Sequence, residues 1–423
     1  MTRLPADSRL PVLVVGHGLR SAPALQIVEA SSGLCEILWL IDESVPENAA
    51  SSRLLRKVGT VVNVAGMSPG QIASAVRPHS PAGAVTYRDE DIVPLSLLAA
   101  ELGFDYYTPE LARCLVDKFA QREALRDGGL PSPGFWEVPI EREPGAVGAL
   151  AAKVEFPAVL KPRIGSGGQY TVPVADAADL VGQVAMLPSG AVYKLGMMVE
   201  QYLASLPSSP EKRFADYLSV DSLVAHGKIS HIAVTGRFPL AEPFRETGFF
   251  IPADISPIEQ AQVLEVATQA LIALGVRTGG FHIEIKWTPD GPRVLEVNGR
   301  LGGGVPEMLF QASGESLMRL SMRVALGEVV HVEGPVSCSK VGWRFLFQAP
   351  PSARRVVTIH GLDRLAALTG VNSIFVNRGP GDAVDPWAGT RHYIYSVYGV
   401  SPDYEGLLEV DRFLHEDVVI DYE

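Results

Sequence analysis

The chain has 423 residues, of which 47% are hydrophobic and 20% are charged. This length and composition exclude a disordered tail and a single small binding module, and they predict about two to four domain-sized units. The net charge of −12, without any run of Lys and Arg, argues against a nucleic-acid partner, because phosphate contacts need a clustered basic surface.

The N-terminal segment carries one short apolar run, at residues 12–15, so we expect no signal peptide. No apolar run approaches the roughly 20 residues that span a bilayer. The cysteines Cys35, Cys114 and Cys338 are far apart and odd in number, which predicts neither a disulfide framework nor a close-spaced zinc site. We therefore expect a soluble, cytoplasmic protein with no membrane partner; a homodimer is left open.

Strand and helix patterns alternate over the first quarter of the chain. Strands are expected at residues 12–16, 36–42, 61–65 and 82–87, with helices between them and at residues 92–103. This alternation predicts an α/β unit, over residues 1–115, with a parallel sheet and crossover helices. The first strand runs into Gly16-His17-Gly18, with Ser21 where a dinucleotide fingerprint has its third glycine. This pattern suggests NAD, or equally a tight strand-to-helix turn.

The middle of the chain changes character. One helix is expected from about residue 109 to 126, containing Lys118 and ending at a Gly128-Gly129 cap. Residues 134–196 predict a small α+β subdomain. Two strands joined at His226-Gly227, a helix at about 257–274 and a hairpin at 281–298 follow. The last 90 residues form either a third domain or an appendage of the second.

The hairpin at residues 281–298 carries two acids on its polar face. Alternation places Phe281, Ile283 and Ile285 on one face with His282 and Glu284 on the other. The second strand is expected to bury Leu295 and Val297 and to expose Glu296 and Asn298. With a three-residue loop at 289–291, Thr288 pairs with Pro292 and Glu284 faces Glu296. Facing carboxylates repel unless a cation lies between them, and Mg²⁺ suits such oxygen donors.

A second candidate site follows the apolar segment at residues 156–160. Lys161 precedes a loop with Gly165, Ser166, Gly167 and Gly168, whose backbone amides could approach an anion. The loop is not a Walker A motif, because no Gly-Lys-Ser/Thr follows. It predicts a phosphate-binding lid, although a plain glycine-rich turn has the same signature.

These motifs, in this order, resemble the ATP-grasp superfamily: DK at 117–118, KPRIGSGG at 161–168, VEQYL at 199–203, SVDSLV at 219–224 and HIEIKWTPDGPRVLEVNGRLGGG at 282–304. Within it they look most like carboxylate–amine ligases, including the L-amino-acid (dipeptide) ligases. The resemblance implies a Rossmann-like pre-ATP-grasp domain (1–115), an ATP-grasp domain (116–333) with a lid subdomain (134–196), and a C-terminal α+β part of the substrate domain (334–423).

The resemblance also implies roles for individual residues around ATP. Lys118 and Lys161 look like the lysines that hold the phosphates, and residues 165–168 look like the loop that closes over them. Glu200 resembles the hinge acid near the adenine, with the backbone of Gln201 and Leu203 at the base. Arg237 stands where the family often has a phosphate contact; a surface arginine is the alternative.

Metal and substrate positions follow in the same way. The Mg²⁺ ligands match Glu284, Glu296 and Asn298, and Mn²⁺ could take the place of Mg²⁺. Arg300 matches the arginine that steadies the substrate carboxylate and its acyl phosphate, so Arg300 and Lys161 are the expected catalytic residues. On the substrate side we expect His282, Gly302, Gly303 and Glu246, with Arg245 and Phe249 near Glu246 in an acceptor pocket.

The sequence departs from the family pattern at the acid that contacts the ribose. The loop LPSSPEKRFADY intervenes there, and Glu211 and Asp216 are both candidates. The expected reaction is ATP-dependent joining of a small-molecule carboxylate, that of an amino acid, to an amine through an acyl phosphate.

Three alternatives stay open. The first is another ATP-grasp ligation, of the biotin-carboxylase or purine-pathway type. The second is an NAD-dependent dehydrogenase, and the third is a non-catalytic nucleotide-binding protein.

Overall fold

A computed structural model describes residues 10–18, 21–141, 143–187, 196–205 and 213–423. The N-terminal part holds a four-stranded parallel sheet in the order β3-β2-β1-β4. Its strands are β1 Val12–Gly16, β2 Glu36–Ile41, β3 Thr60–Asn63 and β4 Pro81–Thr86. Helices α1 Ala24–Ser31, α2 Pro46–Leu55, α3 Pro69–Val76 and α4 Ile92–Leu102 cross over between and after them. The predicted α/β pattern is confirmed.

The expected single helix over residues 109–126 is wrong. Two helices, α5 Pro109–Val116 and α6 Lys118–Asp127, meet at Asp117, whose backbone is extended (φ −105°, ψ 105°). The Asp117 carboxylate accepts hydrogen bonds from the amides of Phe119 and Ala120 and so starts the second helix. Lys118 therefore lies at a helix start rather than in a helix interior.

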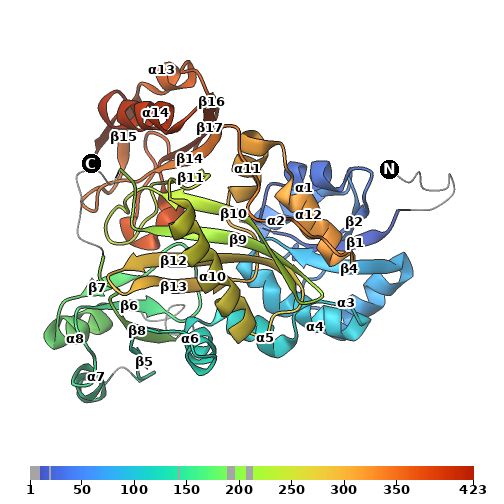
Figure 1. The fold of residues 1–423 in the computed structure, drawn as a ribbon, viewed down its shortest axis with the longest axis horizontal. Coiled ribbons are helices and arrows are strands. Elements are labelled where there is room, and N and C mark those ends of the chain that lie inside the picture. The colour runs from blue at the N-terminus through green and yellow to red at the C-terminus, as the bar shows by residue number, and fades with distance from the viewer. Residues whose placement is uncertain (1–9, 19–20, 142, 188–195, 206–212) are drawn as a thin grey trace.

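A second four-stranded sheet, in the order β5-β8-β6-β7, forms the lid. Its elements are β5 Phe135–Glu137, α7 Pro144–Ala151, β6 Ala158–Pro162, β7 Val172–Val174, α8 Ala177–Met186 and β8 Met197–Gln201. Because β8 pairs with both β5 and β6, this sheet runs past residue 196, where we expected the subdomain to end. Figure 1 shows the lid projecting at one end of the molecule.

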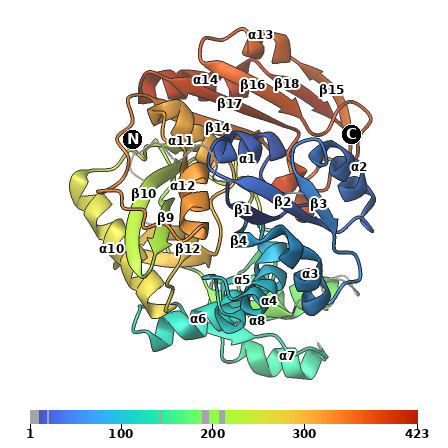
Figure 2. The same cartoon turned by 90° about the vertical axis from the view of Figure 1, so that its right-hand side faces the viewer.

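An eight-stranded antiparallel sheet fills the centre, in the order β13-β12-β9-β10-β11-β14-β17-β16. Its strands are β9 Tyr217–Ala225, β10 Lys228–Arg237, β11 Gly248–Ile251, β12 Gly279–Thr288, β13 Gly291–Asn298, β14 Val341–Phe347, β16 Val371–Val376 and β17 Tyr395–Ser401. The last three come from the final 90 residues, so that segment extends the central sheet and is not a separate third unit. Helices α10 Pro257–Ala273, α11 Val305–Ser313, α12 Leu317–Ala325 and α14 Tyr404–Glu416 lie beside this sheet, and β15 Val356–His360, α13 Leu362–Ala366 and β18 Val419–Tyr422 complete the C-terminal part (Figures 1 and 2).

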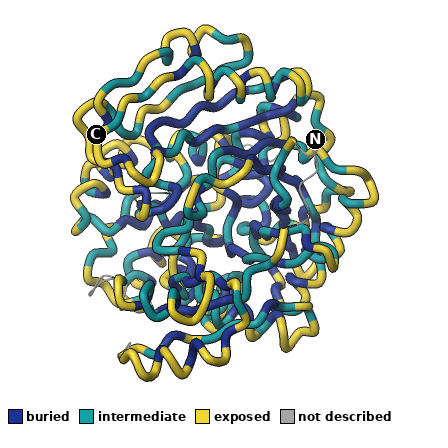
Figure 3. The backbone as a smooth tube through the Cα atoms, turned by 90° about the vertical axis from the view of Figure 1, so that its left-hand side faces the viewer, coloured by how far each residue is buried: buried dark blue, intermediate teal, exposed yellow. Residues whose placement is uncertain are grey.

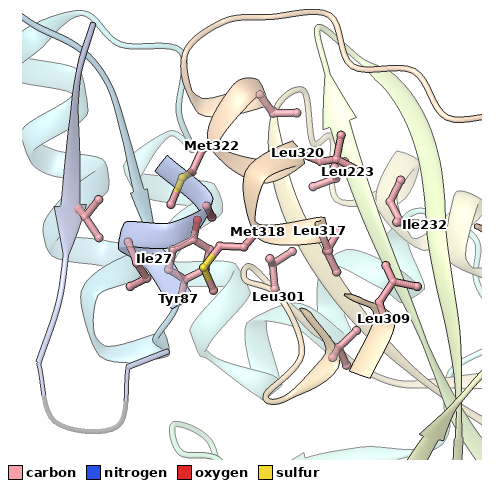
Figure 4. Packing of buried hydrophobic residues seen from close by; sticks show 14 of the residues in the cluster. Ile27, Tyr87, Leu223, Ile232, Leu301, Leu309, Leu317, Met318, Leu320 and Met322 are labelled. Carbon is pink, nitrogen blue, oxygen red and sulfur yellow. The ribbon is translucent and has the colours of Figure 1, made fainter. Parts of the chain in front are cut away.

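The N-terminal unit is joined to the centre through a shared apolar core. Ile27 and Tyr87 from the first unit pack in one cluster with Leu301, Leu317 and Met318 (Figure 4). The Tyr87 hydroxyl lies 3.0 Å from Ser321 Oγ of α12. Figure 3 shows the buried backbone gathered at the centre, with exposed segments around the rim. The cleft described below lies where these parts meet.

A substitution at Gly83 in β4 would test how closely the N-terminal unit packs against α12. A Cβ at Gly83 would lie 1.9 Å from the Ala325 carbonyl oxygen at the end of α12, an approach that backbone atoms cannot absorb cheaply. We expect Gly83→Ala to lower the free energy of unfolding by about 1–3 kcal/mol, as overpacking does. Gly70→Ala, in exposed helix α3 with open space around it, is the control and should be neutral or stabilising by up to about 1 kcal/mol. Equal denaturant midpoints for both variants would contradict this packing.

Candidate active site

One cleft of about 870 Å³ collects nearly all the predicted site residues. It is lined by parts of the N-terminal unit, the lid, the central sheet and the C-terminal segment. The predicted residues in its wall are Lys118, Lys161, Gly165, Ser166, Gly167, Gly168, Glu200, Gln201, Leu203, Arg237, Glu246, His282, Glu284, Glu296, Arg300, Gly302 and Gly303. Of the predicted metal ligands, Asn298 is not in the wall.

Glu284 and Glu296 face each other across β12 and β13, as predicted, but through a different register. Thr288 pairs with Gly291, which makes a two-residue loop, and a bulge after Glu284 restores the phase. The bulge reverses one expectation, because Val294 is buried while Leu295 lines the cleft. Burial, and next the charge of Glu296, raise the pKa of the Glu284 carboxyl.

The residues fit a hard divalent cation held jointly with phosphates. The two opposed carboxylates are only partly neutralised, because Lys118 Nζ lies 3.0 Å from Glu296 Oε1 and does not pair with Glu284. Asn298 is buried, and its Oδ1 accepts from Arg300 Nη2 at 3.4 Å. The described residues contain no group of three or more His, Cys, Asp or Glu placed for a metal. Glu284 and Glu296 are the expected ligands that line the cleft, and Asn298, just outside its wall, stays a predicted ligand; oxygens of a phosphate ligand are the natural complement.

A cluster of buried charged residues joins the lid strands β6 and β8 to helix α6. Arg122 Nε donates to Glu200 Oε2 at 2.6 Å, and Lys161 Nζ donates to Glu200 Oε1 at 2.8 Å. Burial alone would raise the pKa of Glu200, but Arg122 and then Lys161 bring it down to about 2. Burial lowers the pKa of Lys161, and Glu200 opposes that change. Arg122, which the sequence did not single out, also donates to the carbonyls of Val294 and Leu295 and so ties the lid to the hairpin.

The glycine loop at residues 165–168 packs on the C-terminal segment. Lys118 Nζ donates to the Gly165 carbonyl at 2.6 Å, which brings the first lysine to the loop. The Thr390 amide donates to the Gly167 carbonyl at 2.7 Å, and Arg391 Nη2 donates to Ser166 Oγ at 2.8 Å. The loop thus covers the cleft between the two expected phosphate lysines and the short turn Thr390–His392.

His282 and Arg237 belong to one buried network. His282 Nδ1 lies 2.9 Å from Asp221 Oδ2, and Arg237 Nη2 lies 3.1 Å from His282 Nε2. Because arginine can only donate, this arrangement favours the His282 tautomer with its proton on Nδ1. Arg237 also forms an ion pair with Glu246 and is 3% exposed, so the surface-arginine alternative is wrong. Arg245, by contrast, is buried away from the cleft wall, which removes it from the expected acceptor pocket.

Arg300 is held by an acid of the N-terminal unit. Its Nε and Nη2 lie 3.0 Å from the two oxygens of Asp89. Burial would raise the pKa of Asp89, but Arg300 holds it below its usual value. The Gly302 amide donates to Asp221 Oδ1 at 2.8 Å, so that amide is already used. A Cβ at Gly302 would lie 2.5 Å from the His282 ring, which explains the glycine. Sequence reasoning missed Asp89 because it lies 211 positions from its partner.

The end of the cleft near Gln201 and Leu203 carries one more lysine. Lys286 Nζ lies 5.2 Å from the Tyr202 ring centre, 3.1 Å from Ser205 Oγ and 3.5 Å from Asp216 Oδ1. Asp216 itself is not in the cleft wall, and Glu211 lies outside the described residues.

Arg344 of β14 is a further cleft residue that no local pattern in the sequence singles out. Its guanidinium carbon lies 4.7 Å from the Tyr398 ring centre, 5.7 Å from that of Phe249 and 6.0 Å from that of Tyr393. Its buried Nε has no hydrogen-bond partner, and no acid of the described residues lies within ion-pair distance. A half-buried guanidinium held over aromatic rings, with Glu307 acting on it only from beyond ion-pair distance, is suited to bind an anionic group.

The glycine turn that suggested NAD is filled by side chains. A Cβ at Gly16 would lie 3.1 Å from Asp91 Oδ2, and one at Gly18 would lie 2.2 Å from Arg88 Nη1. The glycines therefore let these side chains pack against the turn. This favours the structural interpretation of the pattern over a pyrophosphate site.

Residues 154–307 match the family model of the ATP-grasp domain. The chain contains an ATP-grasp domain. Its fold is shared by an L-amino acid ligase from Bacillus licheniformis, with a TM-score of 0.77 and 20% identity over 98% of this chain and 100% of the other. An N5-carboxyaminoimidazole ribonucleotide synthetase from Thermotoga maritima matches with a TM-score of 0.68 and 18% identity over 98% and 100%. At these identities the structures show the ATP-grasp fold, which confirms the expected fold class.

Curated proteins match this chain in part. The uncharacterized protein y4rH of Sinorhizobium fredii is 28% identical over 278 residues, which cover 65% of this chain and 55% of y4rH. Carnosine synthase 1 of Homo sapiens is 26% identical over 264 residues, which cover 58% of this chain and 31% of that protein. The match thus spans about half of the first relative and a third of the second. In the described part of the chain, every helix is too short or too polar to cross a membrane.

Proposed function

We propose that this protein is an ATP- and Mg²⁺-dependent ligase that activates the carboxylate of an amino acid as an acyl phosphate and joins it to an amine. The observation that carries the proposal is the convergence of Lys118, Lys161, the facing pair Glu284 and Glu296, and Arg300 in one cleft of an ATP-grasp domain. The names of an L-amino acid ligase and of carnosine synthase among similar proteins support it.

In the first step a carboxylate oxygen attacks the γ-phosphorus of ATP, and ADP leaves. Lys118 and Lys161 hold the phosphates. Arg300, which Asp89 holds in place, orients the attacking carboxylate. A magnesium ion at Glu284 and Glu296 would supply positive charge to the transferring phosphoryl group. The loop at residues 165–168 covers the site and limits hydrolysis of the acyl phosphate.

In the second step the amine attacks the acyl carbon and phosphate leaves. Arg300 neutralises the negative charge that develops on oxygen in the tetrahedral intermediate formed by this attack. Arg344 anchors an anionic group, which we assign to the carboxylate of the amine substrate. Its buried Nε without a hydrogen-bond partner, its place over aromatic rings and the absence of an acid within ion-pair distance among the described residues support this assignment.

Other ATP-grasp reactions use the same ATP residues with different acceptors, and carboxylating members share the fold. A screen separates the possibilities. We would measure phosphate release with ATP, Mg²⁺ and pairs drawn from amino acids and small carboxylic acids, with bicarbonate and a ribotide as separate arms. Phosphate release that depends on both an amino acid and an amine supports the proposal. Release that depends on bicarbonate or on the ribotide would refute it, and so would the absence of release with every pair.

Arg344→Gln is expected to raise the KM for an amine that carries a carboxylate by about 10- to 100-fold, since hydrogen bonds to charged groups contribute about 1.5–3 kcal/mol. The KM for the amide of the same amine should change little, because that compound has no anion to lose. Arg364→Gln, at an exposed arginine of α13, is the control. An equal effect of Arg344→Gln on both amines would argue against the carboxylate anchor.

A further inference from the structure

The acids in the cleft differ in whether a basic side chain lies within ion-pair distance of them. Five of the six have a basic side chain within 4.0 Å: Asp89 with Arg300, Glu200 with Lys161, Glu246 with Arg237, Glu284 with His282 and Glu296 with Lys118. The sixth, Glu307, has no ion pair among the described residues. Among the described residues of the cleft, Glu307 is therefore the acid without a basic side chain within ion-pair distance. Glu284, whose neighbour His282 carries no charge in the tautomer that accepts from Arg237, is assigned with Glu296 to the metal.

Glu307 lies in the first turn of α11, directly after the loop of residues 302–304. Its Oε2 accepts from Gln26 Nε2 of α1 at 2.9 Å, and its Oε1 accepts from Gln311 Nε2 at 3.3 Å. Both partners are neutral amides that orient the carboxylate without neutralising it. Partial burial raises the pKa of Glu307, whereas the hydrogen bond from Gln26 and the charge of Arg344, which lies beyond ion-pair distance, lower it.

The proposed reaction requires different charge states for the amino groups of its two substrates. The amine that attacks must be neutral, so an acid that holds it as an ammonium would slow the reaction. The amino acid that is activated gives up its carboxylate to the phosphate and keeps its own ammonium throughout. An unpaired acid in the cleft thus suits the second group and not the first. Arg344, which has no acid within ion-pair distance among the described residues, suits the carboxylate of the other substrate, so we assign Glu307 and Arg344 to different substrates.

On the basis of the proposed function, we propose that Glu307 binds the ammonium group of the amino acid that is activated, so that the carboxylate substrate is an amino acid with a free, protonated amine. Gln26 makes the N-terminal unit part of this subsite, because its amide fixes the orientation of the Glu307 carboxylate. Glu307 is a specificity residue in this account and takes no part in the bond changes.

A purely structural role has a different signature. An acid in the first turn of a helix stabilises that helix through its dipole, by typically 0.3–1 kcal/mol, and its loss lowers stability for every substrate alike. A role in binding changes the preference between two substrates. The decisive readout is therefore the ratio of kcat/KM for an amino acid to kcat/KM for the same acid without its amino group.

We would measure this ratio by ATP-dependent phosphate release, with L-leucine against 4-methylpentanoate and L-alanine against propionate, each with the best amine from the screen. The wild-type protein should prefer the amino acids, and Glu307→Gln should reduce that preference by about 10- to 100-fold. Glu315→Gln, at an exposed acid just beyond the end of α11, is the charge-matched control and should keep the wild-type ratio.

An unchanged ratio in Glu307→Gln, or a wild-type protein that accepts the des-amino acids equally well, would overturn the proposal. The wild-type comparison needs no variant, so the proposal stays testable if Glu307→Gln fails to fold. Absence of phosphate release with every carboxylate and amine would instead refute the proposed function.

Discussion

Replacing Glu296 with alanine is expected to lower kcat/KM for ATP-dependent phosphate release by at least about 100-fold. Glu296 supplies one of the two facing carboxylates, and its loss also leaves Lys118 without its partner at 3.0 Å. Removing a single electrostatic contact to a transition state costs about 10²–10³ in rate. Glu296→Gln, which keeps the shape and removes the charge, should shift half-maximal activity to higher Mg²⁺ concentration.

Asp290→Ala is the matched control for Glu296→Ala. It removes an exposed acid from the turn of the same hairpin, away from the cleft, and should leave activity within about twofold. Survival of full activity in Glu296→Ala would contradict the metal assignment. It is also what a dehydrogenase built on the Gly16 turn would predict.

Replacing Glu200 with glutamine is expected to destabilise the protein by about 3–5 kcal/mol. The change leaves Arg122 and Lys161 buried without their shared counter-ion, and uncompensated buried charge is costly. Glu137→Gln, in the same lid sheet, breaks the half-exposed pair with Arg163 and should cost less than about 1 kcal/mol. Denaturant unfolding of both variants tests this difference. Similar losses would mean that the buried cluster contributes little.

The same residue sets an acid-dependent stability. The folded-state pKa of Glu200, about 2, lies below its ordinary value of 4.5. Its contribution is therefore fully present above pH 4.5 and is lost as the pH falls from about 4.5 towards 2. Wild-type protein should lose stability over this window more steeply than Glu200→Gln. Parallel pH profiles for the two proteins would show that the carboxylate of Glu200 is not the group concerned.

Local patterns explain why much of the site could be predicted from the sequence. Alternation and a turn signal placed Glu284 opposite Glu296, and the order of motifs assigned Lys118 and Lys161 to one site, where both line the cleft. The loop length was wrong, yet the bulge at Leu295 compensated, so the pairing held for a reason that the pattern did not contain. The helix break at Asp117 was missed because periodicity continues across it, and the side-chain cap shows only in the structure.

The missed residues share a physical cause. Asp89, Arg344 and Glu307 enter the site through contacts between segments far apart in the chain, and none belongs to a local pattern. Asp89 meets Arg300 across 211 positions, and Gln26 meets Glu307 across 281. Single-sequence reasoning sees periodicity and spacing, whereas these partners are set by how the N-terminal unit and the final strands pack around the central sheet. The residues that we propose for substrate binding are therefore less predictable from the sequence than those expected around ATP.

The transfer of an oxygen atom tests the proposed reaction most directly. A carboxylate substrate labelled with ¹⁸O at both oxygens would be incubated with ATP, Mg²⁺, the amine and the wild-type protein, and the released phosphate analysed by mass spectrometry. An acyl phosphate that is displaced by the amine leaves one ¹⁸O atom in each phosphate, formed in equal amount to ADP and amide. Phosphate without the label, or label carried into AMP, would contradict activation of the carboxylate at the γ-phosphate.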